Sequence, residues 1–302
     1  NLMRMVLSKA IDGEDNHAEQ AALIAVIRQL LTNHASMDTA LLACMLSLPN
    51  SPYLASLYEK ADPVAISQAR TQLQDQIAAE LQTELLNCRQ ALQDQAQGLT
   101  APAMAARSLR NAALAYLLHI DEARYRELAQ QQFAQADNMT DQYTALCALV
   151  YAEHAETAAQ EALAAFYQQW QHEALVVNMW FQVQATRPWG DVLQMVRKLL
   201  NHEAFDARNP NKLRAVIAAF ASQNFAQFHD KSGQGYQFLA EQIADIDQRN
   251  PQMASRLLTP LTHWHQFTDA HATLMRAALE SLAQRELSKD VYEVVSKSLN
   301  QT

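Results

Sequence analysis

The sequence predicts an all-α fold, an irregular superhelix of antiparallel helix pairs like the HEAT and armadillo solenoids. Only 5 of the 302 residues are glycine, whereas glycine averages about 7% of residues in globular proteins. Alanine, leucine and glutamine are abundant instead, and these residues lose little side-chain freedom in a helix. Apolar residues recur at helical spacing along nearly the whole chain, and no segment keeps the alternating pattern of a strand.

The first half of the chain contains two clear apolar stripes. Leu23, Ile27, Leu30 and Leu31 predict one helix that begins near Asp15 or Asn16. A longer stripe consists of Ile66, Leu73, Ile77, Leu81 and Leu85. Its helix is predicted to begin with Asp62 as N-cap and Pro63 as the first helical residue. The glutamine-rich residues 90–98 are predicted to form a helix end and a loop.

The second half repeats this organisation. A helix is predicted after the turn at residues 187–190, and another near the C-terminus, from the stripes Val192, Met195, Val196, Leu199 and Leu274, Leu279, Leu282. Capping residues followed by proline mark helix starts at Ser51-Pro52, Asp62-Pro63, Asn209-Pro210 and Asn250-Pro251. Short connections favour antiparallel neighbours, and no linker divides the chain. We therefore expect residues 1–302 to form a single domain.

Composition excludes several classes of partner. The formal net charge is −9, which disfavours nucleic acid as a partner because binding to a duplex requires a positive surface. No apolar run is long enough to cross a bilayer, so we expect no membrane association. The widely spaced Cys44, Cys88 and Cys147 indicate reduced, buried thiols of a cytoplasmic protein. Because the chain begins at Asn1 without an initiator methionine, we interpret it as a fragment of a longer protein.

No self-sufficient active site is recognisable in the sequence. A zinc hydrolase helix needs two histidines one turn apart with a glutamate beside the first. His172-Glu173 and His202-Glu203 lack the second histidine, and the spacing of His263 and His265 places them on different sides of a helix. Gly233-Gln234-Gly235 is interpreted as a turn between helices. We therefore expect no catalytic residue and no metal ligand in this chain.

Basic residues near two predicted helix starts are unusual on physical grounds. Lys212 and Arg214 follow the Asn209-Pro210 cap, and Arg256 follows the Asn250-Pro251 cap, where the helix dipole disfavours cations. Gln252 and Arg256 are four residues apart and share a helix face. Two interpretations stay open at this point: these side chains together hold a carboxylate, or they are solvated surface charges.

Several motifs resemble the C-terminal domain of bacterial aminopeptidase N, a zinc metallo-aminopeptidase of the gluzincin family. The motifs that carry the resemblance are residues 62–66 (DPVAI), 109–112 (LRNA), 138–141 (NMTD), 180–181 (WF), 184–186 (QAT), 209–214 (NPNKLR), 228–229 (FH), 233–236 (GQGY), 249–257 (RNPQMASRL) and 290–293 (DVYE). Each motif is short, but together they are specific and extend over nearly the whole chain, most securely from about Thr39 onward.

The resemblance implies a non-catalytic role. In that family a separate catalytic domain, whose motifs are absent here, carries the zinc and releases N-terminal amino acids from peptides. The C-terminal domain caps the active site, forms the substrate chamber and contributes side chains to substrate binding. By motif match, Gln252 would border the pocket for the first side chain of the peptide, and Arg256 and Arg214 would lie beyond the scissile bond. Lys212 departs from the arginine of the family pattern, and we expect it to face solvent outside the site.

The resemblance also implies the partners. The catalytic domain of the same polypeptide and peptide substrates would contact this chain, and the only cofactor would be zinc in that other domain. The alternative is a freestanding helical-repeat scaffold for protein–protein interaction. A scaffold would have its own start codon and a polar capping helix, whereas a fragment would expose an apolar surface where the rest of the enzyme docks.

Overall fold

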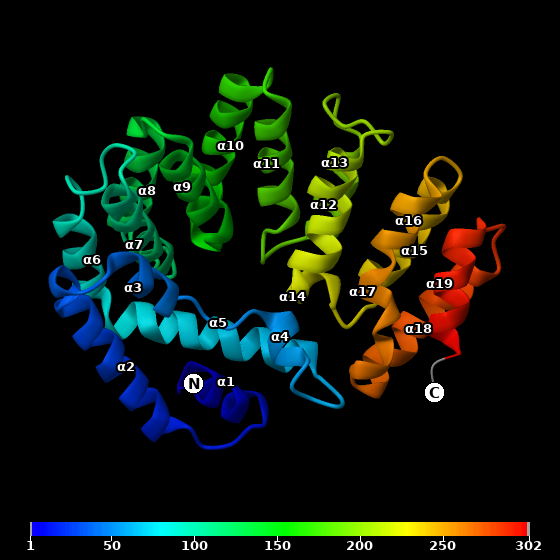
Figure 1. Cartoon of the computed structure of the whole chain (residues 1–302), viewed down its shortest axis with the longest axis horizontal. Coiled ribbons are helices and arrows are strands. Elements are labelled where there is room, and N and C mark those ends of the chain that lie inside the picture. Colours follow the sequence, from blue (N-terminus) through cyan, green and yellow to red (C-terminus); the bar gives the residue numbers. More distant parts are fainter. Residues whose placement is uncertain (1, 301–302) are drawn as a thin grey trace. The chain divides into compact units, whose positions relative to one another are not determined.

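The computed structural model describes residues 2–300, and these residues are almost entirely helical (Figure 1). The β-type pairing within them is an isolated parallel bridge between Ala61 and Phe267. The all-α prediction is therefore confirmed. The chain divides into two compact units, unit 1 (Asn1–Asn50 and Gln68–Ala165) and unit 2 (Ser51–Ser67 and Phe166–Thr302). The assignment of residues 1–302 to a single functional domain stays a prediction.

Unit 1 contains helices from the N-terminal half of the chain. They are α1 (Leu2–Ile11), α2 (His17–Thr32), η1 (His34–Ser36), α3 (Thr39–Met45), most of α5 (Pro63–Glu80), α6 (Gln82–Ala91), α7 (Ala101–Leu117), α8 (Ala123–Gln135), α9 (Met139–Tyr151), η2 (Glu153–Ala155) and most of α10 (Glu156–Trp170). Helix α7 is central, because α3, α6, α8 and α9 all pack against it. Helix α2 contacts both α1 and α6.

The predicted start of α5 is confirmed, but the helix is shorter than its apolar stripe. Asp62 Oδ1 accepts hydrogen bonds from the backbone N–H of Val64 at 2.8 Å and of Ala65 at 3.2 Å. The helix ends at Glu80, and α6 begins at Gln82 after a bend at Leu81 (φ −115°, ψ 17°). Leu81 and Leu85 are fully buried, so the stripe continues across the bend. The spacing of the apolar residues indicates which side chains are buried. A bend of this kind does not interrupt the row of buried side chains, so the spacing did not reveal it.

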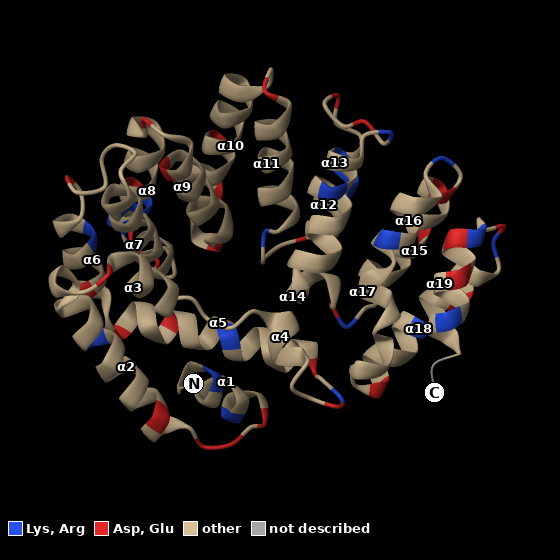
Figure 2. Cartoon of the chain, in the orientation of Figure 1, with Lys and Arg blue, Asp and Glu red and all other residues tan. Residues whose placement is uncertain are grey.

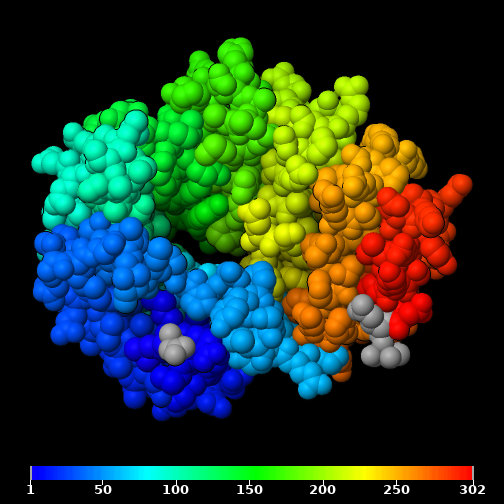
Figure 3. Space-filling view, viewed as in Figure 1, coloured from blue at the N-terminus to red at the C-terminus, as the bar shows by residue number. Residues whose placement is uncertain are grey.

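Unit 2 contains the remaining helices. They are α4 (Ser51–Ala55), α11 (Ala174–Ala185), α12 (Val192–Leu200), α13 (Pro210–Leu213), η3 (Arg214–Gln223), α14 (Phe225–Phe228), α15 (Gln234–Asp247), α16 (Pro251–Leu257), α17 (Thr259–Thr262), η4 (Trp264–Gln266), α18 (Asp269–Ala283) and α19 (Lys289–Leu299). Helix α15 packs on α16 and α18, and α19 on α16 and α18. Figure 3 shows the side chains of α16 to α19 in close contact (orange to red).

The corner between α14 and α15 is shaped by its two glycines. Gly233 adopts a left-handed backbone (φ 70°) as the residue before α15, which glycine adopts without a steric penalty. At Gly235 a Cβ atom would lie 2.6 Å from the carbonyl oxygen of Phe228. The predicted turn between helices is present, but it ends at Gly233, because Gln234 and Gly235 already belong to α15. The second glycine is explained by close packing of the two helices.

Three smaller expectations need correction or comment. Ser51 is the first residue of α4 rather than the residue before it. Cys88 is buried as expected, but Cys44 is exposed and Cys147 is partly exposed. Cys44 lies on α3 two residues after the buried Leu42, on another side of the helix. Among the described residues, no helix is long and apolar enough to span a membrane.

Candidate substrate-binding site

Gln252 and Arg256 lie side by side on the exposed face of α16. Asn250 caps this helix, because its side-chain oxygen accepts a hydrogen bond from the N–H of Met253 at 3.1 Å, and Pro251 is the first residue, as predicted. Met253, Ala254 and Leu257 are buried, which turns the face containing Gln252 and Arg256 toward solvent. The local sequence therefore fixes the direction in which the two side chains point.

The polar ends of Gln252 and Arg256 are available to a ligand. Neither side chain makes a hydrogen bond or ion pair with another residue in the range 2–300. Because the two residues are one helical turn apart, an amide and a guanidinium are presented together. A guanidinium binds a carboxylate through two parallel hydrogen bonds, so this arrangement suits the polar ends of a peptide.

Arg214 lies at the start of η3, which is a π-helical segment of ten residues. Asn209 caps the preceding α13 by accepting a hydrogen bond from the N–H of Asn211 at 2.9 Å, as predicted. The exposed side chain of Arg214 donates in turn to Asn211 Oδ1 at 2.9 Å. The NPNKLR motif therefore holds one end of the Arg214 guanidinium in place. The sequence predicted an ordinary helix here, whereas π-helical backbone is rare and often occurs at functional sites.

The expectation that Lys212 faces solvent is wrong. Lys212 is only 7% exposed, and its Nζ lies 5.0 Å from the centre of the Phe181 ring. Burial lowers the pKa of this amine below its ordinary value, because a low-dielectric surrounding disfavours the charged form. The helical register explains the error: Lys212 and Leu213 both point inward, and Arg214 points outward.

The three predicted residues come from two elements, Gln252 and Arg256 from α16 and Arg214 from η3. Helix α15 contacts both η3 and α16. The charged residues of α15 are acidic, whereas those of η3 and α16 are basic, as the colours of Figure 2 indicate. A carboxylate shared by Arg214 and Arg256 stays a prediction.

Two of the histidines considered in the sequence, His202 and His263, contact neighbouring side chains or backbone of unit 2. His202 lies 5.0 Å, centre to centre, from the rings of both Tyr167 and Trp180. His263 Nδ1 lies 3.2 Å from the carbonyl oxygen of Thr259. In the described part of the chain, no group of three or more His, Cys, Asp or Glu side chains converges in a way that could hold a metal ion. These residues therefore do not fit a zinc site.

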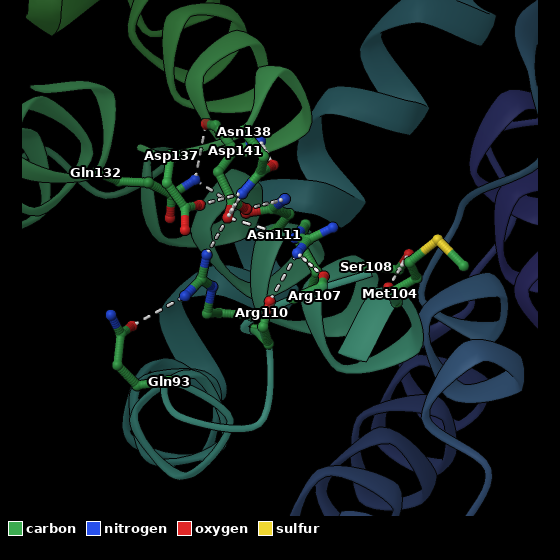
Figure 4. Close-up of polar contacts among 12 residues, drawn as sticks. Gln93, Met104, Arg107, Ser108, Arg110, Asn111, Gln132, Asp137, Asn138 and Asp141 are labelled. Carbon is green, nitrogen blue, oxygen red and sulfur yellow. Dashed lines mark hydrogen bonds and ion pairs between the residues drawn. The ribbon is translucent and has the colours of Figure 1, made fainter. Parts of the chain in front are cut away.

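Sequence reasoning missed a buried polar cluster in unit 1, which we call the arginine cluster. Its members are Arg89, Arg107, Arg110, Asn111, Gln132 and Asp141, each less than 10% exposed. Two motifs that carried the family resemblance, residues 109–112 and 138–141, meet here (Figure 4). The spacing contained a usable indication, because Ala103, Arg107, Arg110 and Leu114 follow helical spacing on one face of α7. Two charges on an otherwise apolar face predict a buried polar network.

Comparison with known proteins shows where this chain belongs. Residues 1–300 match the family model described as "Domain of unknown function (DUF3458_C) ARM repeats". Proteins named aminopeptidase N are similar over most of the chain: that of Escherichia coli is 41% identical over 87% of it, and that of Haemophilus influenzae 36% over 93%. That of Caulobacter vibrioides is 37% identical over 98%. The chain covers 30–34% of these three proteins.

A solved structure supports the same assignment. The crystal structure of Legionella pneumophila aminopeptidase A in complex with aspartic acid superposes with a TM-score of 0.89 at 28% identity. The match covers 99% of this chain and 36% of that protein. The chain is thus homologous to the C-terminal region of longer aminopeptidases, and its helices follow the repeat pattern of that region. It belongs to the DUF3458_C family of ARM-repeat domains found in bacterial aminopeptidase N.

Proposed function

We propose that this chain is the non-catalytic C-terminal domain of a zinc-dependent aminopeptidase, where it covers the active site and helps to bind the peptide. The observation that carries the proposal is the exposed pair on α16: Gln252 and Arg256 point outward without partners among the described residues. The similarity to aminopeptidase N over 87–98% of the chain supports it. A freestanding scaffold receives less support, because these relatives are about three times longer than the chain.

In this proposal the chemistry takes place outside the chain. Zinc would be held by a catalytic domain of the same polypeptide and would activate the water that attacks the first peptide bond. Arg256 and Arg214 would bind the C-terminal carboxylate of a short peptide, and Gln252 would border its first side chain. Hydrogen bonds between charged groups contribute about 1.5–3 kcal/mol. Each arginine is therefore expected to change kcat/KM by roughly tenfold to a hundredfold.

The test compares substrates with and without a nearby carboxylate. Arg256→Ala and Arg214→Ala are introduced into the complete aminopeptidase that contains this chain, and kcat/KM is measured on di- and tripeptides and on an aminoacyl anilide. We expect kcat/KM to fall for the peptides and to change little for the anilide. Arg285→Ala is the matched control, because Arg285 is an exposed arginine of the same unit. Equal losses on both substrates, or a large fall in Tm, would assign the arginines to structure instead.

The non-catalytic part of the proposal has its own test. The chain alone, with or without added zinc, is expected to leave alanyl and leucyl chromogenic substrates uncleaved. Zinc-dependent turnover that survives removal of contaminating peptidases would contradict this part and leave the binding role of the arginines to be judged by the first experiment.

A further inference from the structure

The arginine cluster of unit 1 contains more buried positive than negative charge. Asp141 Oδ2 lies 2.6 Å from Arg110 Nη2 and 3.5 Å from Arg107 Nε, so two guanidiniums share one carboxylate. Burial alone would raise the pKa of Asp141, but hydrogen bonds from Asn138, Arg110 and Asn111 outweigh it and hold that pKa below its usual value. The carboxylate is therefore charged at neutral pH, and the cluster as a whole carries surplus positive charge.

Arg89 has no carboxylate of its own. Its Nη2 donates to Gln132 Oε1 at 2.9 Å, and its Nε has no hydrogen-bond partner. Burial, followed by repulsion from Arg110, lowers the pKa of Arg89 to about 10. Such a charge is costly in a protein interior unless another group compensates it. Arg89 is 5% exposed. It is therefore a buried cation that lacks a negatively charged partner among the described residues.

The neighbouring residues hold Arg89 in one orientation. The amide nitrogen of Gln132 donates to Asn111 Oδ1 at 2.9 Å and to the carbonyl oxygen of Asp141 at 3.0 Å. The side-chain oxygen of Gln132 is consequently fixed in the position where it accepts the hydrogen bond from Arg89. This chain of hydrogen bonds connects α6, α7, α8 and α9, and Figure 4 shows its part around Asn111, Gln132 and Asp141. The guanidinium is thus placed before any ligand binds.

A cavity of about 520 Å³ lies beside these groups, within the usual range for small-molecule sites. Arg89 and Arg110 line it, and so do several glutamines, among them Gln90, Gln93 and Gln135. The Nε atoms of both arginines are unpaired. Two carboxylates, Asp137 and Asp141, also line the cavity. Asp137 is exposed and one of its oxygens accepts from Asn138, and Asp141 is paired with Arg107 and Arg110.

The geometry points to a binding site for a small oxyanion, a carboxylate or phosphate group attached to a polar molecule, between α6, α7 and α8. The anion would pair with the guanidiniums of Arg89 and Arg110, and the glutamine amides would hydrogen-bond the rest of the ligand. The cavity is larger than one phosphate ion, which is why we infer a polar molecule rather than a bare ion. This site lies in unit 1 and does not depend on the proposed role of Arg256 and Arg214 in unit 2.

The test is a thermal-shift titration of the chain with sodium phosphate and sodium succinate, against sodium chloride at equal ionic strength. A ligand present at ten times its Kd is expected to raise the Tm by about 2–5 °C. A response to phosphate alone assigns a phosphate site, and a response to succinate alone assigns a carboxylate site. If neither exceeds chloride, the proposal is overturned.

Two variants locate the response. Arg89→Gln is expected to abolish it, whereas the matched control Arg4→Gln, which removes an exposed arginine of the same unit, should keep it. Because Arg89 is buried and its substitution can prevent folding, Gln93→Glu provides a second variant at an exposed position. Arg110 Nη1 donates to Gln93 at 3.2 Å, so the new carboxylate should occupy Arg110 and lower the affinity at least tenfold. An unchanged response in folded Gln93→Glu would place the anion elsewhere.

Discussion

Unit 1 and unit 2 use arginine in opposite ways. In unit 1, Arg107 and Arg110 are buried around one carboxylate, whereas in unit 2 Arg214 and Arg256 are exposed. A buried guanidinium loses its hydration and depends on its partners, but an exposed one is compensated by water. Removal of the carboxylate that Arg107 and Arg110 share should therefore change mainly stability, whereas substitution of Arg214 or Arg256 should change mainly binding.

The largest expected effect is that of Asp141→Ala. Removing the carboxylate leaves the buried guanidiniums of Arg107 and Arg110 without their negative partner, and breaking a buried pair in this way costs about 3–5 kcal/mol. Urea denaturation followed by circular dichroism measures the loss. Asp137→Ala, an exposed carboxylate nearby, is the control and should change stability by less than about 0.5 kcal/mol. Equal losses of stability in the two variants would show that the burial of Asp141 does not make it more important for stability than the exposed Asp137.

The second prediction compares the pH dependence of the two units. Burial, followed by repulsion from His271, lowers the pKa of His229 to about 3, while the unfolded chain has an ordinary histidine pKa of about 6.5. Below pH 6.5 the unfolded state therefore binds more protons, and unit 2 loses about 1.4 kcal/mol per pH unit as the pH falls. The lowered pKa of Asp141 has a later effect, because its contribution is lost only below about pH 4.

Unfolding at several pH values between 7.5 and 4.5 measures this slope. His229→Gln is the informative variant, because Gln can still hydrogen-bond the Tyr236 hydroxyl, which lies 2.8 Å from His229 Nδ1, but does not titrate. Its slope should be smaller by about one proton. If the slope of the variant equals that of the natural chain, His229 is not the group that titrates.

A third prediction sharpens the comparison within unit 2. Lys212 is buried without an ion-pair partner among residues 2–300, so Lys212→Met removes a poorly compensated charge and keeps most of the volume. The lost cation–π contact with Phe181 opposes this gain. We expect a change between zero and a stabilisation of about 1 kcal/mol. A loss of more than 1 kcal/mol in urea denaturation would mean that the amine has a partner in solution.

The smallest expected effect on stability is that of Arg256→Ala. The side chain is exposed and has no partner in the described part of the chain, so the free energy of unfolding should change by no more than about 0.5 kcal/mol. Arg110→Ala provides the buried counterpart and should lose several times more. Similar losses of unfolding free energy for the two variants would show that the buried and the exposed arginines contribute equally to stability.

Local chemistry made much of the fold predictable. The caps at Asp62, Asn209 and Asn250 each make the expected hydrogen bonds, because a cap depends on residues next to it in sequence. Lys212 was misjudged, since its burial depends on Phe181 and on the register after Pro210. The arginine cluster was missed for a similar reason: Asp141 and Arg110 are 31 positions apart, and their contact is decided by helix packing.

For the candidate site, the sequence correctly predicted the helix starts at Pro210 and Pro251. Gln252, Arg256 and Arg214, which follow these starts, are exposed. Periodicity alone could not predict the π-helical backbone of η3, because the residues of an α-helix and of a π-helix can be equally apolar. The packing of both η3 and α16 against α15 is a tertiary property as well.

The bridge between Ala61 and Phe267 has a consequence for how the chain is made. The N–H of Ala61 donates to Gln266 at 2.7 Å, and the N–H of Thr268 donates back to Ala61 at 2.9 Å. Residues 51–67 belong to the same unit as residues 166–302, although the ribosome makes Ala61 about 200 residues before Phe267. During synthesis at about 5–20 residues per second, this early segment waits at least ten seconds for its partner. Unit 2 can complete its fold only after unit 1 has emerged, and a fragment cut at residue 67 or 166 would split it.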